Sequence, residues 1–302
     1  MSVISTCLDY ILWPLLFLSA VTITSIGMAQ DHGQLYFNIA YFSLALTLFI
    51  LERIRPHARE WLPSDGQEWA DLGHTSLTKS LVQLLAIMMP LLGVTHLMDG
   101  SAGPGIWPDH WPVWAQVVLG LAVGEMGLYW GHRLAHEWPV LWRFHAVHHS
   151  AKKLWFFNTG RFHFVDTFKS VLLSLILLAL AGAPEFVLMW FGAITAYIGF
   201  LTHCNIRMRS GWLKYLFNTP NLHRWHHSTD LREGNKNYGE NLMIWDLLFG
   251  TFYDDEKRQP PVNIGIRDAM PKKFLGQLTT PFYWKKFQSA FDAGRVDRHK
   301  CM

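Results

Sequence analysis

Residues 113–150 read VWAQVVLGLAVGEMGLYWGHRLAHEWPVLWRFHAVHHS, and this stretch decides the fold. Its first part, 113–130, is an apolar run interrupted by a single charged residue, Glu125. Such a run approaches the roughly 20 helical residues that cross a bilayer core of about 30 Å. Five histidines then fall within residues 132–149, where an even spread of all 16 would place about one. The stretch therefore predicts a membrane helix that ends in a histidine cluster.

The composition of the whole chain supports a membrane protein. Of its 302 residues, 50% are hydrophobic and only 16% are charged, against about 25% charged in soluble proteins. The three cysteines, Cys7, Cys204 and Cys301, are far apart, which argues against a disulfide scaffold and against a cysteine-based metal site. The net charge of +3 is too small to indicate a nucleic-acid partner. A soluble globule and a disordered chain are both excluded.

Further apolar runs predict the rest of the architecture. We expect an all-α integral membrane protein with about four transmembrane helices, a broken helical hairpin and a histidine-rich helical cap. The expected hairpin is two short helices, separated at 181–185, that need not cross the bilayer fully. The predicted spans are 10–29, 35–51, 76–98 and 113–130, with the hairpin at 167–202. The predicted regions are an N-terminal transmembrane region at 1–110, a histidine-rich domain at 111–255 and a polar tail at 256–302 that is expected on the surface.

The distribution of basic residues predicts the orientation. Residues 30–34 and 99–112 contain no Lys or Arg, whereas 52–75, 131–166 and 203–302 carry nearly all of them. These two sets of loops alternate along the proposed spans, which is the positive-inside pattern. We therefore expect a multi-pass protein with both termini and the histidine clusters cytoplasmic, in the inner membrane if the source is bacterial. The first span could instead be a secretory signal, but it lacks a positive leading segment and carries Asp9.

Eight histidines occur in three groups with helical spacing. Residues three and four apart share one face of a helix, so each group presents its imidazoles together. Imidazole suits Zn, Cu, Fe and Ni, and eight such ligands exceed the needs of one ion, so two metal ions are predicted. The groups are HRLAH with His132 and His136, HAVHH with His145, His148 and His149, and HRWHH with His223, His226 and His227.

Other polar residues are candidates for supporting roles. His203, at the end of the predicted hairpin, is a candidate ninth ligand, with Asn205 nearby to hydrogen-bond or to bind through water. His163 could be a ligand, a residue that supports one, or an interfacial residue. Glu125 lies two helical turns before His132 and could accept a hydrogen bond from a ligand imidazole, or simply make an interhelical contact. Similar supporting roles are open to Glu137, Asp166, Asn237, Glu240 and Asp246.

The order of these motifs resembles the fatty acid hydroxylase and sterol desaturase superfamily. The stretch 125–150 and the stretch LHRWHHSTDLREGNKNYGENLMIWDLLFGTFY, residues 222–253, are especially similar to its bacterial sterol-desaturase-like members, and the resemblance covers about residues 110–255. It implies a non-haem centre of two iron ions, with the eight clustered histidines and His203 as ligands. Some members carry a further histidine where this chain has Arg207.

The resemblance also implies an activity. Members use O2 and two electrons from a separate donor, of cytochrome b5, ferredoxin or reductase type, to oxidise a lipid C–H bond. Hydroxylation is preferred here over desaturation of a sterol or fatty acyl lipid. Three other classes of protein fit the sequence less well. An intramembrane zinc hydrolase would need HExxH, and HEWPV at 136–140 lacks the second histidine. The other two are a bis-histidine haem carrier and a metal transporter, which would place its ligands within the spans.

Overall fold

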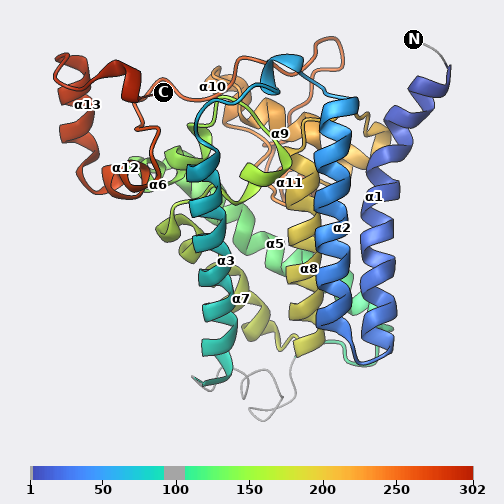
Figure 1. The fold of residues 1–302 in the computed structure, drawn as a ribbon. Coiled ribbons are helices and arrows are strands. Elements are labelled where there is room, and N and C mark those ends of the chain that lie inside the picture. Colours follow the sequence, from blue (N-terminus) through green and yellow to red (C-terminus); the bar gives the residue numbers. More distant parts are fainter. Residues whose placement is uncertain (1–2, 92–105, 302) are drawn as a thin grey trace.

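The computed structural model describes residues 3–91 and 106–301, and within these ranges the chain is helical with four isolated β-bridges. Long helices form a bundle, and shorter helices lie over one of its ends (Figure 1). The long helices are α1 (Val3–Ala29), α2 (Gly33–Ile54), α3 (Glu68–Leu91), α5 (Val113–Glu137), α7 (Phe164–Ala181) and α8 (Glu185–His203). The shorter ones are α6 (Pro139–His149), α9 (Pro220–His226), α10 (Leu231–Gly234), α11 (Ile244–Leu248), α12 (Phe274–Thr279) and α13 (Trp284–Asp292). The expected all-α membrane fold is confirmed.

Among the described residues, five helices are long and apolar enough to cross a membrane: α1, α2, α5, α7 and α8. The break between α7 and α8 follows from the sequence AGAPE. Gly182 ends α7 with φ of 75°, and Pro184 precedes the first residue of α8. The two helices have 18 and 19 residues, so they are longer than the short hairpin helices that the sequence predicts. At about 1.5 Å per residue, each helix is nearly as long as the bilayer core is thick.

The third predicted span corresponds to α3, which is not among these five helices. Helix α3 begins at Glu68 rather than at residue 76, and its first turns carry Asp71 and His74, both buried. Residues 92–98 of the predicted span lie outside the described residues. That α3 spans the membrane therefore stays a prediction.

Glycines allow α5 and α7 to pack closely. A Cβ atom on Gly127 would lie 2.5 Å from the backbone nitrogen of Ser174, and one on Gly131 would lie 2.8 Å from the Ser170 hydroxyl. Because the two glycines are four residues apart, they lie on the same face of α5, and this part of the face has no side chains. This close approach places the end of α5, with its histidines, directly beside the start of α7.

Both chain ends lie at the same end of the bundle as the short helices α9, α10 and α11 (Figure 1). The connections between α1 and α2 and between α7 and α8 lie at the opposite end. The C-terminal segment is not a free polar tail. Met270, Gln277 and Thr280 are fully buried, and the ring of His74 on α3 bonds through Nε2 to Oε1 of Gln277 at 3.1 Å.

Candidate metal centre

The structure brings nine histidines together in two adjacent groups. They come from the end of α5, from α6, from the last residue of α8 and from α9 with the residue that follows it. Within each group the candidate ligand atoms all lie within 4.8 Å of one another. The five-histidine group is His132, His136, His145, His149 and His226, and the four-histidine group is His148, His203, His223 and His227.

In the five-histidine group, each of four rings uses Nδ1 to bond outward. His132 bonds to the carbonyl of Tyr238 at 2.8 Å, and His226 bonds to the carbonyl of Lys236 at 2.7 Å. Because a carbonyl can only accept, Nδ1 of both rings carries the proton and Nε2 keeps its lone pair. Nε2 of His132, His145 and His226 is buried without a hydrogen-bond partner among the described residues.

The other two outward bonds go to side chains. Nδ1 of His145 lies 2.7 Å from a carboxylate oxygen of Asp166, and Nδ1 of His136 lies 3.0 Å from the amide oxygen of Asn235. Outer partners of this kind fix the tautomer and the orientation of metal-binding imidazoles. The group therefore has the two layers of contacts that a metal site requires, with ligand nitrogens inside and hydrogen-bond acceptors outside.

The four-histidine group converges through Nε2. The distances between Nε2 atoms are 2.8 Å from His203 to His223, 3.1 Å from His223 to His227 and 3.1 Å from His227 to His148. His203 alone has an outward bond, from Nδ1 to Oδ1 of Asn158 at 2.8 Å. Nδ1 of each of the other three rings is buried with no partner among the described residues.

These nitrogens suit metal ions. Burial, and then the charges of neighbouring rings, lower the pKa of His148, His149, His223 and His227 well below 6.5, so these rings are neutral at pH 7. Neutral lone pairs that face one another repel unless a proton or a cation lies between them. Metal–nitrogen bonds of about 2.0–2.1 Å place neighbouring ligand nitrogens roughly 3 Å apart, which matches the spacing observed here.

Comparisons with known proteins agree with this geometry. Residues 117–251 match the pattern of the fatty acid hydroxylase family. The chain is 48% identical over 276 residues to the ornithine lipid hydroxylase OlsE of Rhizobium tropici. The aligned region covers 90% of this chain and 83% of that protein. The chain belongs to the fatty acid hydroxylase family. The predicted resemblance is thus confirmed.

More distant relatives of this fatty acid hydroxylase family member are alkylglycerol monooxygenases. The Danio rerio protein is 31% identical over 240 residues, which is 75% of this chain but only 51% of that protein. The Homo sapiens protein is 30% identical over 153 residues, half of this chain and 33% of that protein. The chain therefore spans between about a third and about half of the length of these two relatives. No solved structure matches it. The relatives confirm the expectation of an oxygen-dependent enzyme of the hydroxylase and monooxygenase type.

Among the described residues of this hydroxylase, Glu125 makes no hydrogen bond to a histidine, so the predicted hydrogen bond to a ligand imidazole is wrong. Its buried carboxylate accepts from the backbone N–H groups of Glu240 and Asn241. Asp246 accepts in the same way from the backbone of Tyr238 and Gly239. Glu125 and Asp246 thus fix the backbone of residues 238–241, and the carbonyl of Tyr238 in this loop bonds to His132. Both carboxylates therefore position His132 indirectly, through the loop backbone.

Asn237 lies at the middle of this loop. It has a φ of 56°, a left-handed conformation that asparagine tolerates better than most residues. Its side chain donates to the carbonyls of Leu222 and Tyr253 and accepts from the backbone of Tyr253. These bonds fix the positions of the two neighbouring residues, Lys236 and Tyr238. The carbonyl of each neighbour bonds to a ring of the five-histidine group.

Other predicted residues lie away from the two groups. His163 precedes α7 and accepts from the backbone of Val165, while its Nε2 donates to the Leu278 carbonyl. Asn205 exchanges hydrogen bonds with the backbone of Ala58, so it supports the fold and not the centre. Glu137 pairs with Arg133 at the surface.

Sequence reasoning missed the partners Asn158 and Asn235 and the carbonyls of Lys236 and Tyr238. The polar run EGNKNYGEN at 233–241 was the available signal, since it follows the last histidine motif.

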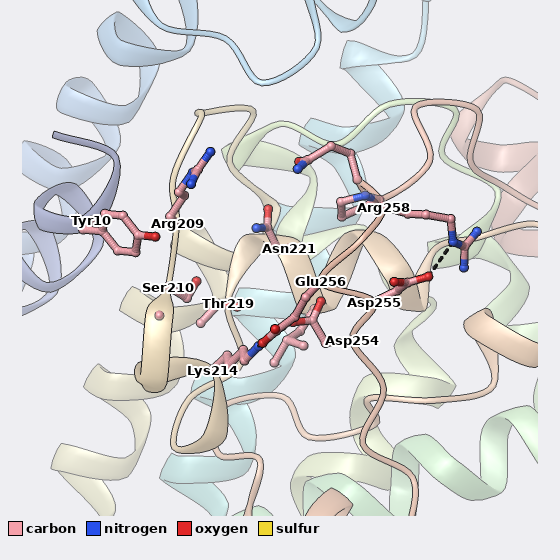
Figure 2. Close-up of a pocket in the computed structure, with 14 residues that line it drawn as sticks. Tyr10, Arg209, Ser210, Lys214, Thr219, Asn221, Asp254, Asp255, Glu256 and Arg258 are labelled. Carbon is pink, nitrogen blue, oxygen red and sulfur yellow. Dashed lines mark hydrogen bonds and ion pairs between the residues drawn. The ribbon is translucent and has the colours of Figure 1, made fainter. Parts of the chain in front are cut away.

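A surface cavity of about 360 Å³ lies apart from the centre (Figure 2). None of the nine histidines lines it. Most of its charges are already paired: Lys214 bonds to Asp254 and Glu256, and Arg258 bonds to Asp255. This cavity is thus not the metal site.

Proposed function

We propose that the chain is a membrane-bound oxidoreductase that hydroxylates a C–H bond of a lipid with O2, two iron ions and electrons from a separate donor. One atom of O2 enters the new hydroxyl group, and the other leaves as water with two electrons and two protons. The five-histidine group would hold one ion and the four-histidine group the other. Bound iron would supply the activation of O2. The observation that carries the proposal is the convergence of nine histidines, five of which have hydrogen-bond acceptors on the outside that favour lone pairs on the inside.

The protein's own residues have defined tasks in this proposal. Tyr238, Lys236, Asn235, Asp166 and Asn158 orient the rings through their outward nitrogens. Most of the nine rings are nearly inaccessible to solvent, which keeps bulk water from the centre. The spanning helices α5 and α8 end in ligands, so a lipid held along their apolar surfaces is near the centre.

The substrate that the relatives favour is a lipid with an amino-acid headgroup. The support is the 48% identity to an ornithine lipid hydroxylase along 90% of this chain. Hydroxylation rather than desaturation fits the names of these relatives, which are hydroxylases and monooxygenases.

A zinc hydrolase would need a carboxylate base at the metal. Among the described residues, both groups consist of histidines alone.

The centre and both termini would face the cytoplasm, where a soluble or membrane-bound donor can deliver electrons. Two observations support this orientation. The loops rich in Lys and Arg are those next to the histidines. Both chain ends and the short helices lie at the same end of the bundle (Figure 1).

Metal analysis and lipid mass spectrometry test the proposal together. Purified protein is expected to hold about two iron ions per chain. Cells that express the chain should contain a lipid with one added oxygen atom, and His148→Ala should abolish it. The matched control is His32→Ala, in the connection between α1 and α2 at the other end of the bundle, which should leave the product unchanged. Iron-free protein with full activity would refute the metal assignment. Lipids that do not differ between wild type and His148→Ala would refute lipid oxidation.

A further inference from the structure

The C-terminal tip, which we define as residues 272–287, carries a concentration of positive charge. Lys272, Lys273, Lys285 and Lys286 lie in it, and no Asp or Glu occurs from residue 271 to 291. None of these four lysines forms an ion pair among the described residues, whereas lysines elsewhere in the chain do. The charge of the tip is therefore not neutralised within the protein.

The same tip exposes large apolar side chains. Leu275 is 69% exposed, Phe282 is 58% exposed and Tyr283 is 45% exposed. Tyr283 and Phe287, with Lys286 and Ala290, also line a shallow apolar groove on α13. Exposed apolar groups gathered in one place mark a surface that binds something. Here that partner must accept both apolar contact and positive charge.

The position of the tip indicates which partner this is. The ring of Phe282 lies 6.4 Å from that of Phe164, the first residue of the spanning helix α7, and 5.5 Å from that of His163. One turn further along α7, Phe168 is exposed on the outer surface of the bundle, where lipid chains would lie. Phe282 thus continues the apolar surface of α7 at the level where that helix enters the membrane.

The tip is held firmly at this level. Gln277 of α12 is fully buried and bonds to His74 and to Gln67, and the Leu278 carbonyl accepts from His163. In Figure 1, α12 lies near α3, and α13 continues away from the bundle. The exposed apolar residues before α13 are therefore the part of this segment closest to the spanning helices.

We propose that the C-terminal tip is an interfacial anchor that binds the anionic headgroups of the membrane in which the protein lies. Aromatic side chains are favoured at the headgroup level, and lysines near an anionic surface each add attraction worth roughly a five-fold change in partitioning. The partner is the lipid surface and not a soluble protein, because the apolar side chains of the tip are continuous with the surface of α7. The anchor does not depend on the reaction that the centre performs.

Fluorescence quenching in lipid nanodiscs tests the anchor on the full-length protein. Cys7 is replaced by Ser, since it is the exposed cysteine, and Phe282→Cys, Leu275→Cys and Asp292→Cys each receive an environment-sensitive dye. Asp292, at the far end of α13, is the control position. Lipids with a nitroxide near the headgroup should quench the dye at 282 and 275 at least several-fold more than at 292. Adding phosphatidylglycerol to zwitterionic discs should increase this quenching.

Charge reversal separates lipid attraction from simple proximity. Lys286→Glu should weaken the response to phosphatidylglycerol, whereas Lys257→Glu, an exposed lysine outside the tip, should not. Equal quenching at 275, 282 and 292 would overturn the proposal. So would dyes at 275 and 282 that are shielded only when an electron donor protein or a second copy of the chain is added. The Leu275→Cys variant keeps the test decisive if Phe282→Cys fails to fold.

Discussion

Replacing Asn235 with Ala should weaken metal binding without unfolding the protein. The amide oxygen of Asn235 is the acceptor for Nδ1 of His136, at 3.0 Å, and Nε2 of the same ring points toward His149 at 3.1 Å. Without this acceptor the ring is free to rotate and to change tautomer. Loss of such an outer partner typically costs 10- to 100-fold in metal affinity, which corresponds to about 1.4–2.7 kcal/mol.

The expected cost to the fold is much smaller. Asn235 is only partly buried, and its backbone N–H, which bonds to the Leu231 carbonyl at the end of α10, is unchanged by the substitution. The loss of one side-chain hydrogen bond is worth about 1 kcal/mol or less. Asn263→Ala is the matched control, because Asn263 is exposed and makes no side-chain hydrogen bond among the described residues.

The assay is competition between iron-loaded protein and a chromogenic chelator, with thermal unfolding of the metal-free protein measured in parallel. Asn235→Ala should lose one ion per chain at a chelator concentration 10- to 100-fold lower than wild type, with nearly the same melting temperature. Metal retention equal to that of Asn263→Ala would refute the reasoning. A large fall in the melting temperature of the metal-free protein would show instead that Asn235 mainly supports the fold.

Four further outcomes follow from the structure. The four-histidine group should release its ion first, because it has one ligand fewer and three of its rings lack an outward partner; chelation kinetics should show two phases. Gly127→Ala should lower the melting temperature by several degrees, because its Cβ would meet the Ser174 backbone, whereas Gly192→Ala, with open space around it, should not. Asn237→Ala should destabilise more than Asn237→Gly, since glycine adopts the positive φ without strain. Burial raises the pKa of Glu240 to about 8, so this carboxyl group is neutral in the folded protein but ionised in the unfolded chain above about pH 4.5. The group therefore lowers the free energy of unfolding increasingly as the pH rises to 8. Glu240→Gln should raise the melting temperature at pH 8 but not at pH 5.

Each of these outcomes has a clear contrary result. Release of both ions in a single phase would show that the two groups bind equally. Equal melting temperatures for the two glycine variants would show that α7 adjusts to the added methyl group. A glycine at 237 as harmful as alanine would assign the whole effect to the lost hydrogen bonds. A gain from Glu240→Gln that is the same at pH 5 and pH 8 would exclude ionisation as its cause.

The histidine clusters could be found from the sequence because their signal is local. Spacings of three and four residues place imidazoles on one helical face whatever the rest of the chain does. His203 belongs to the four-histidine group although it has no neighbouring histidine in the sequence; its position at the end of a predicted helix was the available signal.

The partners of Glu125 could not be found in the same way. Its separation of two turns from His132 does place both residues on one face of α5, but the carboxylate accepts hydrogen bonds from the backbone N–H groups of residues 240 and 241. Which carbonyl reaches which ring depends on a loop that is distant in sequence and fixed by Asn237 and Asp246. The charged C-terminal segment likewise gave no local sign that Gln277 would be buried against His74.

The order of the ligands along the chain has a consequence for biogenesis. His132 and His136 emerge from the ribosome with α5, long before His226 and before the carbonyls of residues 236 and 238 that hold His226 and His132. Neither histidine group is complete during insertion of the early helices, because both include residues from 223–227. In the proposed iron centre, loading of the five-histidine group would therefore follow synthesis of residue 238, and nascent chains that stall before this residue should be recovered without bound metal.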